Sequence, residues 1–151
     1  MKTLKIYLDN CCFNRPYDDQ SQLSVYLETQ AKLQIQEKVK NKNIELVWST
    51  ILDFENAANS DEAVKIEIES WRKLSLAIIH QNNEIVAKAN TLKSFSLKGK
   101  DSLHISCAIA ANCDYFVTVD KGILKKASMV DGILIKSAIE MIEIMEANDE
   151  D

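Results

Sequence analysis

The chain of 151 residues is long enough to bury the core of one ordinary domain, and its 46% hydrophobic and 27% charged residues are typical of a soluble globular protein. No run approaches the roughly 18 consecutive apolar residues of a membrane helix, so we expect no membrane partner. The formal charge of -5 argues against simple binding to a nucleic-acid backbone, but it does not exclude an enzyme that holds metal ions between carboxylates.

The N-terminal segment begins with a short apolar run, Leu4 to Leu8, which stops at Asp9. Because the run is short and Lys5 interrupts it, it predicts a first strand rather than a signal peptide, and hence a cytoplasmic protein. Pro16 fixes a loop after this strand. Asp19 or Ser21 can cap the helix that follows.

The rest of the chain alternates helices and strands. Apolar residues recur every four positions from 23 to 39, which predicts a helix. We expect further strands at 44–48, 74–80, 115–119 and 132–136, and further helices at 51–59, 61–73, 84–96, 102–113, 121–128 and 137–147. Strands that are apolar on both faces and alternate with helices predict a three-layer α/β/α sandwich around a parallel sheet of about five strands. With one proline and three glycines no linker is visible, so we expect a single domain over residues 1–146 and a frayed acidic tail over 147–151.

Four cysteines, Cys11, Cys12, Cys107 and Cys113, match no zinc-binding pattern, because the sequence contains no C-x-x-C pair. We interpret them as reduced thiols, most of them buried. A nucleophilic cysteine would need a partnered base, and the sequence does not place either histidine beside Cys11.

Acidic residues lie where two of the predicted strands end. Asp9 follows the first strand and Asp120 follows the fourth, while Glu55 and Asp101 lie at the starts of helices that follow such loops. Ligands of an open parallel sheet bind beyond the carboxyl ends of the strands, so we expect all four acids at one edge. Taken singly, each is also explained as a turn former or a helix cap, Asp101 above all.

Carboxylates gathered at one edge repel one another, by roughly 4 kcal/mol for two unit charges about 4 Å apart at an effective dielectric constant of about 20. Such a cluster raises its own pKa values or binds a cation, and oxygen ligands alone favour Mg²⁺ or Mn²⁺. Two such ions in one site activate a water and stabilise the leaving oxygen of a phosphodiester. The pattern therefore predicts a metal-dependent nuclease.

Several segments make the chain resemble the PIN-domain family, from the first strand to the last helix. The most specific is D-x-x-H-I-x-x-A-x-A followed by an apolar strand and T-V-D, between Asp101 and Asp120. The others are IYLDNCCFNRPYDD, WSTILDFE and LIKSAIEMI. The resemblance implies a parallel-sheet sandwich and Mg²⁺- or Mn²⁺-dependent RNA cleavage, with Asp9, Glu55, Asp101 and Asp120 as the catalytic and metal-binding residues. Many bacterial members are VapC-type toxins that form dimers and are inhibited by a cognate antitoxin.

The sequence departs from the family pattern at Asn10, where the family often has Ser or Thr; an amide can still bond a carboxylate or a water, so Asn10 remains a supporting residue. Asp53 competes with Glu55 for the second acid, and we prefer Glu55 because the S-T-x-x-x-x-E arrangement matches the family. Asp114 precedes the fourth strand and is expected at the opposite edge of the sheet.

Five further residues are candidates for supporting roles. Thr118 points to the same side of its strand as the acid two residues later, where it either supports a metal site or fills the sheet. His104 lies one helical turn after the third acid, and packing is its simpler explanation. Arg15, Lys100 and Lys121 are candidate contacts to RNA phosphates, with an ordinary solvated surface as the alternative. The other lysines of this candidate basic rim are Lys98, Lys125 and Lys126.

We therefore expect a cytoplasmic endoribonuclease, the candidate toxin of a type II toxin–antitoxin module, acting as a homodimer on single-stranded RNA or on structured RNA such as tRNA. Tyr17 is the only aromatic residue expected near its site. The alternative is a catalytically silent PIN-like binding or scaffold module. The presence of all four acids argues against this alternative. A phosphatase of the haloacid-dehalogenase type is disfavoured, because Cys11 stands where that motif needs a second aspartate.

Overall fold

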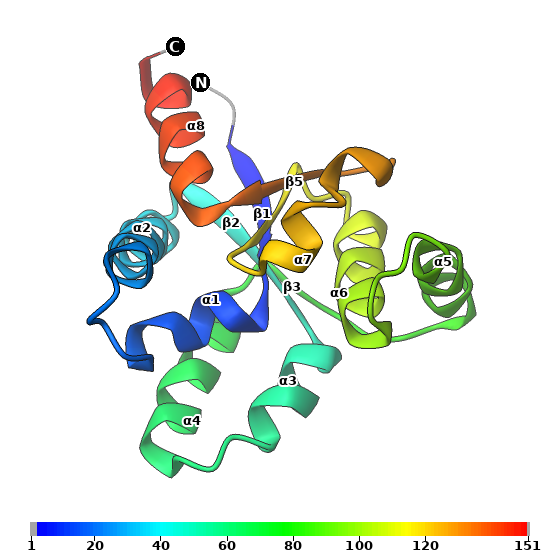
Figure 1. Ribbon diagram of the computed structural model, residues 1–151, viewed down its shortest axis with the longest axis horizontal. Coiled ribbons are helices and arrows are strands. Elements are labelled where there is room, and N and C mark those ends of the chain that lie inside the picture. The colour runs from blue at the N-terminus through cyan, green and yellow to red at the C-terminus, as the bar shows by residue number, and fades with distance from the viewer. Residues whose placement is uncertain (1–2, 151) are drawn as a thin grey trace.

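The computed structural model describes residues 3–150, except for the side chain of residue 150, and is built on a five-stranded parallel sheet (Figure 1). The strands are β1 (Leu4–Leu8), β2 (Ile44–Ser49), β3 (Ala77–Ile79), β4 (Tyr115–Thr118) and β5 (Leu134–Ser137). They lie in the order β3-β2-β1-β4-β5, with every neighbouring pair parallel. The chain thus builds outward from β1 in one direction and then returns to add β4 on its other side.

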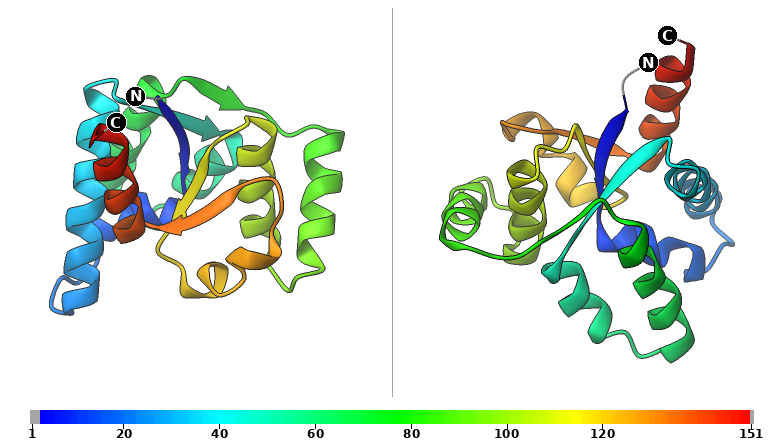
Figure 2. Two further views of the ribbon diagram at one scale, coloured as in Figure 1. Left: turned by 90° about the horizontal axis from the view of Figure 1, so that it is seen from above. Right: turned by 180° about the vertical axis from the view of Figure 1, so that it is seen from behind.

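Helices cover both faces of this sheet. They are α1 (Asn10–Asn14), α2 (Leu23–Lys40), α3 (Thr50–Ala57), α4 (Glu62–Glu69), α5 (Asn83–Lys93), α6 (Gly99–Ala110), α7 (Lys121–Leu124) and α8 (Ala138–Glu150). Helices α2 and α8 pack together on one side of the strands, and α5 and α6 pack together on the other (Figure 2). This arrangement confirms the predicted three-layer α/β/α sandwich.

The central strands are the most buried part of the molecule, because helices cover them on both sides. Ile6, Tyr7 and Leu8 of β1 and Phe116 and Val117 of β4 are completely shielded from solvent. Strands buried on both faces favour continuous apolar sequences, as the predicted strands have. The pairing of β1 with β4 joins residues more than a hundred positions apart, with Leu8 opposite Val117.

The structure differs from the expected elements at several places. The segment after β1 is not a plain loop but the short helix α1, followed by a 3₁₀ turn over Arg15–Tyr17 that contains Pro16. Helix α6 begins at Gly99, so the third acid lies in the first helical turn instead of capping the helix. Helix α8 continues to Glu150 and therefore includes residues 147–150, which the sequence placed in a frayed tail.

The apolar stripe of α2 is only partly buried. Ala31, Ile35 and Val39 are buried as predicted, but Leu23 is 70% and Leu27 is 45% exposed. Burial along this helix begins at Thr29, so only its later turns lie against the body of the protein. Among the residues that the structure describes, no helix is long and apolar enough to cross a lipid bilayer.

Candidate active site

The four predicted acids come from elements that meet at the carboxyl end of the sheet. Asp9 directly follows β1, and Asp120 follows β4, two strands that lie side by side where the strand order reverses. Glu55 lies on α3, which begins where β2 ends, and Asp101 lies in the first turn of α6. This is the position at which open α/β sheets bind ligands.

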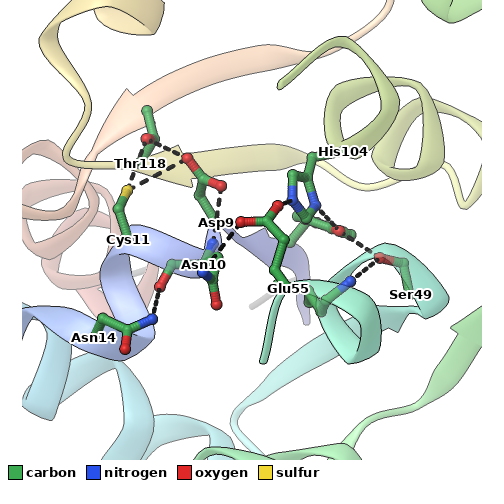
Figure 3. A network of polar contacts seen from close by, with 10 residues as sticks. Asp9, Asn10, Cys11, Asn14, Ser49, Glu55, His104 and Thr118 are labelled. Atoms are coloured by element: carbon green, nitrogen blue, oxygen red, sulfur yellow. Dashed lines mark hydrogen bonds and ion pairs between the residues drawn. The ribbon is translucent and has the colours of Figure 1, made fainter. Parts of the chain in front are cut away.

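Asp9 is only 5% exposed, and its carboxylate accepts hydrogen bonds from three donors. Its Oδ1 accepts a hydrogen bond of 2.8 Å from the backbone N–H of Asn10, since Asp9 is also the N-cap of α1. Its Oδ2 accepts a hydrogen bond of 2.8 Å from the Thr118 hydroxyl and one of 3.3 Å from the Cys11 thiol. The carboxylate, which directly follows β1, is therefore fixed in orientation by residues from α1 and β4, as Figure 3 shows.

Asn10 connects the first acid to the second. Its side-chain Nδ2 donates to Glu55 Oε2 over 3.1 Å, while its backbone N–H bonds Asp9. The amide oxygen of Asn10 is buried and has no hydrogen-bond partner among the described residues. A buried carbonyl oxygen without a partner, beside two carboxylates, is an acceptor suited to a cation or a water.

Glu55 is held from its other side by a buried chain of hydrogen bonds. His104 Nε2 bonds Glu55 Oε1 (Figure 3). His104 Nδ1 lies 2.5 Å from the Tyr7 hydroxyl, which in turn lies 2.6 Å from the Ser49 hydroxyl. Tyr7 and Ser49 are completely buried and His104 is 1% exposed. Burial raises the pKa of Tyr7 well above its usual value, so the phenol keeps its proton and can donate it.

These contacts determine the charge of Glu55. Burial alone would raise the pKa of its carboxyl, but the hydrogen bond and charge of His104, the charge of Lys100 and the Asn10 amide outweigh burial and hold that pKa below its ordinary value. Glu55 is therefore a carboxylate at neutral pH. The sequence pointed to His104 as a packing residue, whereas the structure makes it both a core residue and the partner of an acid.

Asp101 has the opposite electrostatic setting. Burial, together with the nearby charges of Asp9 and Asp120, raises the pKa of Asp101 to about 6. The charges of Asp9 and Asp120 therefore act on Asp101, as expected for acids that lie at a common edge.

Asp120 is also placed by local backbone bonds. It is the N-cap of α7, where its Oδ1 accepts from the Ile123 N–H over 3.1 Å, and its own N–H donates to Thr118 Oγ1 over 3.1 Å. Gly122 lies directly under this carboxylate, because a Cβ added there would lie 3.0 Å from Asp120 Oδ1. Asp120 can therefore cap α7 and also be a residue of the candidate site.

A cavity of about 330 Å³ opens beside the third and fourth acids. Lys126 lies at its wall and is held there by a 2.6 Å bond from its ammonium to the Ser96 carbonyl. The lining residues are Ser96, Leu97, Lys98, Asp101, Asp120, Gly122 and Lys126. Two lysines and two aspartates facing one hollow give a place where an anion and a cation can be bound together.

The predicted phosphate contacts lie in different surroundings. Arg15 pairs with Asp18 at 3.0 Å and with Glu28 at 3.3 Å, so a contact to RNA would require these ion pairs to open. Lys121 is exposed at the first position of α7, next to Asp120. Lys100 lies with its ammonium 5.7 Å from the centre of the Phe54 ring.

The two acids that the sequence placed outside the site, Asp53 and Asp114, have other hydrogen-bond partners. Asp53 accepts a 2.8 Å hydrogen bond from the Trp48 indole and pairs with Arg72 at 3.2 Å. Asp114 precedes β4 and accepts the Lys5 backbone N–H over 2.9 Å, at the opposite end of the strands. Among the side chains that the structure describes, no three of His, Cys, Asp or Glu are placed tightly enough to enclose a metal ion as they stand.

The cysteines are free thiols, as expected. Burial raises the pKa of Cys107 to about 11 and that of Cys113 to about 12, which keeps both protonated. Cys11 differs, because its sulfur lies 3.3 Å from both Asp9 Oδ2 and Thr118 Oγ1. The sequence offered no signal for this contact, since α1 was not predicted and only its helical turn brings position 11 back to position 9.

No model of a known protein family and no curated protein sequence matches the chain. Solved structures do match in fold. One is a chain of VapBC2 from Rickettsia felis, solved bound to a DNA fragment from their promoter, with a TM-score of 0.55, 15% identity, and 89% of this chain and 98% of that chain covered.

A second is a chain of DNA-bound VapBC from Salmonella typhimurium, with a TM-score of 0.58, 12% identity, and 90% of this chain and 99% of that chain covered. At these identities the likeness is one of fold. It spans almost the whole of each chain, and it confirms the fold that the PIN-domain resemblance implies.

Proposed function

We propose that this chain is a metal-dependent endoribonuclease that hydrolyses RNA phosphodiester bonds in the cytoplasm. The observation that carries the proposal is the meeting of Asp9, Asp101 and Asp120 where the strand order reverses, with a pKa of about 6 for Asp101 that reflects burial and the charge of the other two. Isolated turn formers or helix caps would not be expected to perturb one another in this way.

The donor atoms are of the kind that suits Mg²⁺ or Mn²⁺, although no three acidic side chains among the described residues enclose an ion as they stand. They are carboxylate oxygens, joined by the buried Asn10 carbonyl oxygen that has no partner among the described residues. Hard divalent ions prefer such oxygens, and a positive charge would relieve the repulsion that raises the pKa of Asp101. When bound, such an ion supplies charge for the scissile phosphate and lowers the pKa of a water.

The protein's own residues have distinct roles in this proposal. Asp9, Asp101 and Asp120 provide the negative charge that holds the cation, and Thr118 fixes the orientation of Asp9 through its 2.8 Å hydrogen bond. Glu55, kept ionised by His104, adds a fourth carboxylate to this set. The Lys98 and Lys126 side of the adjacent cavity can bind the phosphate chain on one side of the cleaved bond.

The fold neighbours suggest a biological setting. Both are described as VapBC assemblies solved with DNA. We propose that the present chain is likewise the toxin of a toxin–antitoxin pair, that it forms a homodimer, and that a cognate antitoxin inhibits it. Copurification with the product of a neighbouring small reading frame would test the pairing.

The nuclease proposal is tested with the purified chain, single-stranded RNA and Mn²⁺. We expect cleavage that EDTA abolishes and that Asp120→Asn removes. Asp114→Asn is the matched control, because it changes an acid at the other end of the same strand and keeps an oxygen that can accept the Lys5 N–H. Equal cleavage by the two variants would refute the assignment of the site.

Calorimetry distinguishes the nuclease from the second candidate, a silent binding module. The presence of all four acids in one region favours the nuclease over this candidate, because a module without a metal site has no need of buried or half-buried carboxylates that repel one another. Binding of Mn²⁺ to the wild-type chain, lost in Asp120→Asn and retained in Asp114→Asn, supports the nuclease; no binding by the wild-type chain supports the silent module.

A further inference from the structure

One aromatic side chain next to the acids is unusually exposed. Phe54 precedes Glu55 on α3 and is 67% exposed, although apolar rings of this size are normally among the buried residues of a domain. The sequence singled out Tyr17 as the aromatic residue near the site and did not single out Phe54.

Lys100 lies near the Phe54 ring and also acts on an acid of the candidate site. The Lys100 ammonium lies 5.7 Å from the centre of the Phe54 ring, which is within the range of a cation–π contact. The same ammonium lowers the pKa of Glu55, so its charge is felt at that acid. Phe54 and Glu55 are neighbours on α3, and Lys100 and Asp101 are neighbours on α6, so an exposed ring and a cation together adjoin two of the four acids.

From this juxtaposition we propose that Phe54 and Lys100 form a stacking platform for a base of single-stranded RNA next to the scissile phosphate. The Phe54 ring stacks against the base, and the Lys100 ammonium, which lies over the ring, attracts the adjoining phosphate. The inference rests on the proposed nuclease function and adds the part of the substrate that is recognised: an unpaired nucleotide with its base turned outward.

Physical considerations favour a base over other occupants of this surface. The face of the Phe54 ring away from Lys100 offers apolar area to a base, and every base has a π-face, so that stacking binds single strands with little sequence preference. A duplex would keep its bases stacked on one another and could not present one to the ring. The lysine adds charge complementarity to a polyanion at a place where the acids would otherwise repel it.

The test uses the full chain carrying Asp120→Asn without added metal, so that RNA is not cleaved. Two fluorescently labelled probes of equal length are compared: an oligoadenylate, and an abasic ribose-phosphate oligomer that has the same charge but no bases. Adding Phe54→Ala should weaken oligoadenylate binding by about 5- to 150-fold, the range for the loss of one aromatic stacking contact, and leave the abasic oligomer unaffected. Phe54→Trp should retain binding, with its emission quenched by the oligoadenylate.

Two further variants separate stacking from charge and from general loss of apolar surface. Lys100→Ala should weaken both probes, because it removes a cation that acts on phosphate. Leu134→Ala removes an exposed apolar side chain, 57% exposed, at the start of β5 and should change neither. Circular dichroism verifies that each variant is folded, which is expected because Phe54 and Leu134 are surface residues.

Three outcomes would overturn the platform: no binding of oligoadenylate by the starting variant, an equal loss for both probes in Phe54→Ala, or no loss for either. In the last case the exposed ring belongs to a protein interface instead. Cleavage of RNA by the wild-type chain is measured alongside. If the wild type cleaves and Phe54→Ala binds normally, only the platform fails; if the wild type does not cleave, the nuclease proposal fails.

Discussion

Replacing Asp101 by Asn should make the metal-free protein more stable at neutral pH while removing the proposed nuclease activity. Burial and the charges of Asp9 and Asp120 raise the pKa of Asp101 from 3.8 to about 6. A raised pKa means that the folded protein holds the neutral carboxyl better than the charged one, so ionisation at neutral pH opposes folding. The uncharged amide removes that opposition.

The size of the effect follows from the shift. One pKa unit corresponds to about 1.4 kcal/mol, so a shift of this size corresponds to roughly 3 kcal/mol before screening. Asp101 is only half-buried, and solvent screening reduces the figure to roughly 1–2 kcal/mol. A carboxylate in the first turn of α6 also gains about 0.3–1 kcal/mol from the helix dipole, which the amide forgoes. The net gain should be about 1 kcal/mol, or roughly 2–4 °C in Tm for a chain of this size.

The pH dependence has a definite sign. Below about pH 3 the carboxyl of Asp101 is protonated in both the folded and the unfolded chain, so wild type and Asp101→Asn should have equal stability there, and the difference between them is still small at pH 4. Between pH 4 and about 6 the wild type loses stability relative to the variant, and above that range the difference is constant. Addition of Mn²⁺ should reverse the order, because only the wild type retains the full set of ligands.

Thermal unfolding followed by circular dichroism in EDTA at pH 4 and pH 7, and then with Mn²⁺ at pH 7, measures all three effects. Asp131→Asn, a change at an exposed acid, is the control and should shift the free energy of unfolding by less than about 0.5 kcal/mol. A variant that is less stable than wild type at pH 7 in EDTA, or a difference that persists unchanged at pH 4, would show that Asp101 is not in a crowded carboxylate cluster.

Three further predictions concern groups around the site and the core. Tyr7→Phe removes the hydroxyl that bridges two buried polar groups, and should lower the free energy of unfolding in urea by about 1–3 kcal/mol and weaken Mn²⁺ binding in calorimetry; unchanged stability would argue against the buried chain. Gly122→Ala should weaken Mn²⁺ binding with little effect on Tm, because its Cβ would lie 3.0 Å from Asp120 Oδ1, and equal affinity would mean that this carboxylate is not a ligand. Lys32 is 4% exposed and burial lowers its pKa to about 8, so Lys32→Met should add about 1–2 kcal/mol at pH 7 in chemical denaturation. That gain should shrink as the pH rises from 8 to 10, where the wild type becomes more stable, and a constant gain would contradict a buried charge.

The strand ends were predictable because they depend on local patterns. An apolar run that stops at an acid fixes both the strand and the position of the acid beyond it, which is why Asp9 and Asp120 were found together with the strands that carry them. The choice of Glu55 over Asp53 used only a spacing, and the structure places Asp53 on the Trp48 indole.

What the sequence did not predict depends on contacts across the sheet. The chain from Ser49 through Tyr7 and His104 to Glu55 joins β2, β1, α6 and α3, so it requires the strand order as well as the identity of the elements. The exposure of Leu23 has the same cause, since periodicity gives a helical face but not how much of the helix has a partner.

The pairing of β1 with β4 also determines when the site can exist during synthesis. The hydrogen bond from Thr118 to Asp9 links two residues separated by 109 positions, and nearly four-fifths of the chain must leave the ribosome before it can form. Contacts between such distant residues form late and slowly in folding. A nascent or prematurely terminated chain therefore lacks the fourth acid and the donor that orients the first, so the proposed site cannot be complete until synthesis is almost finished.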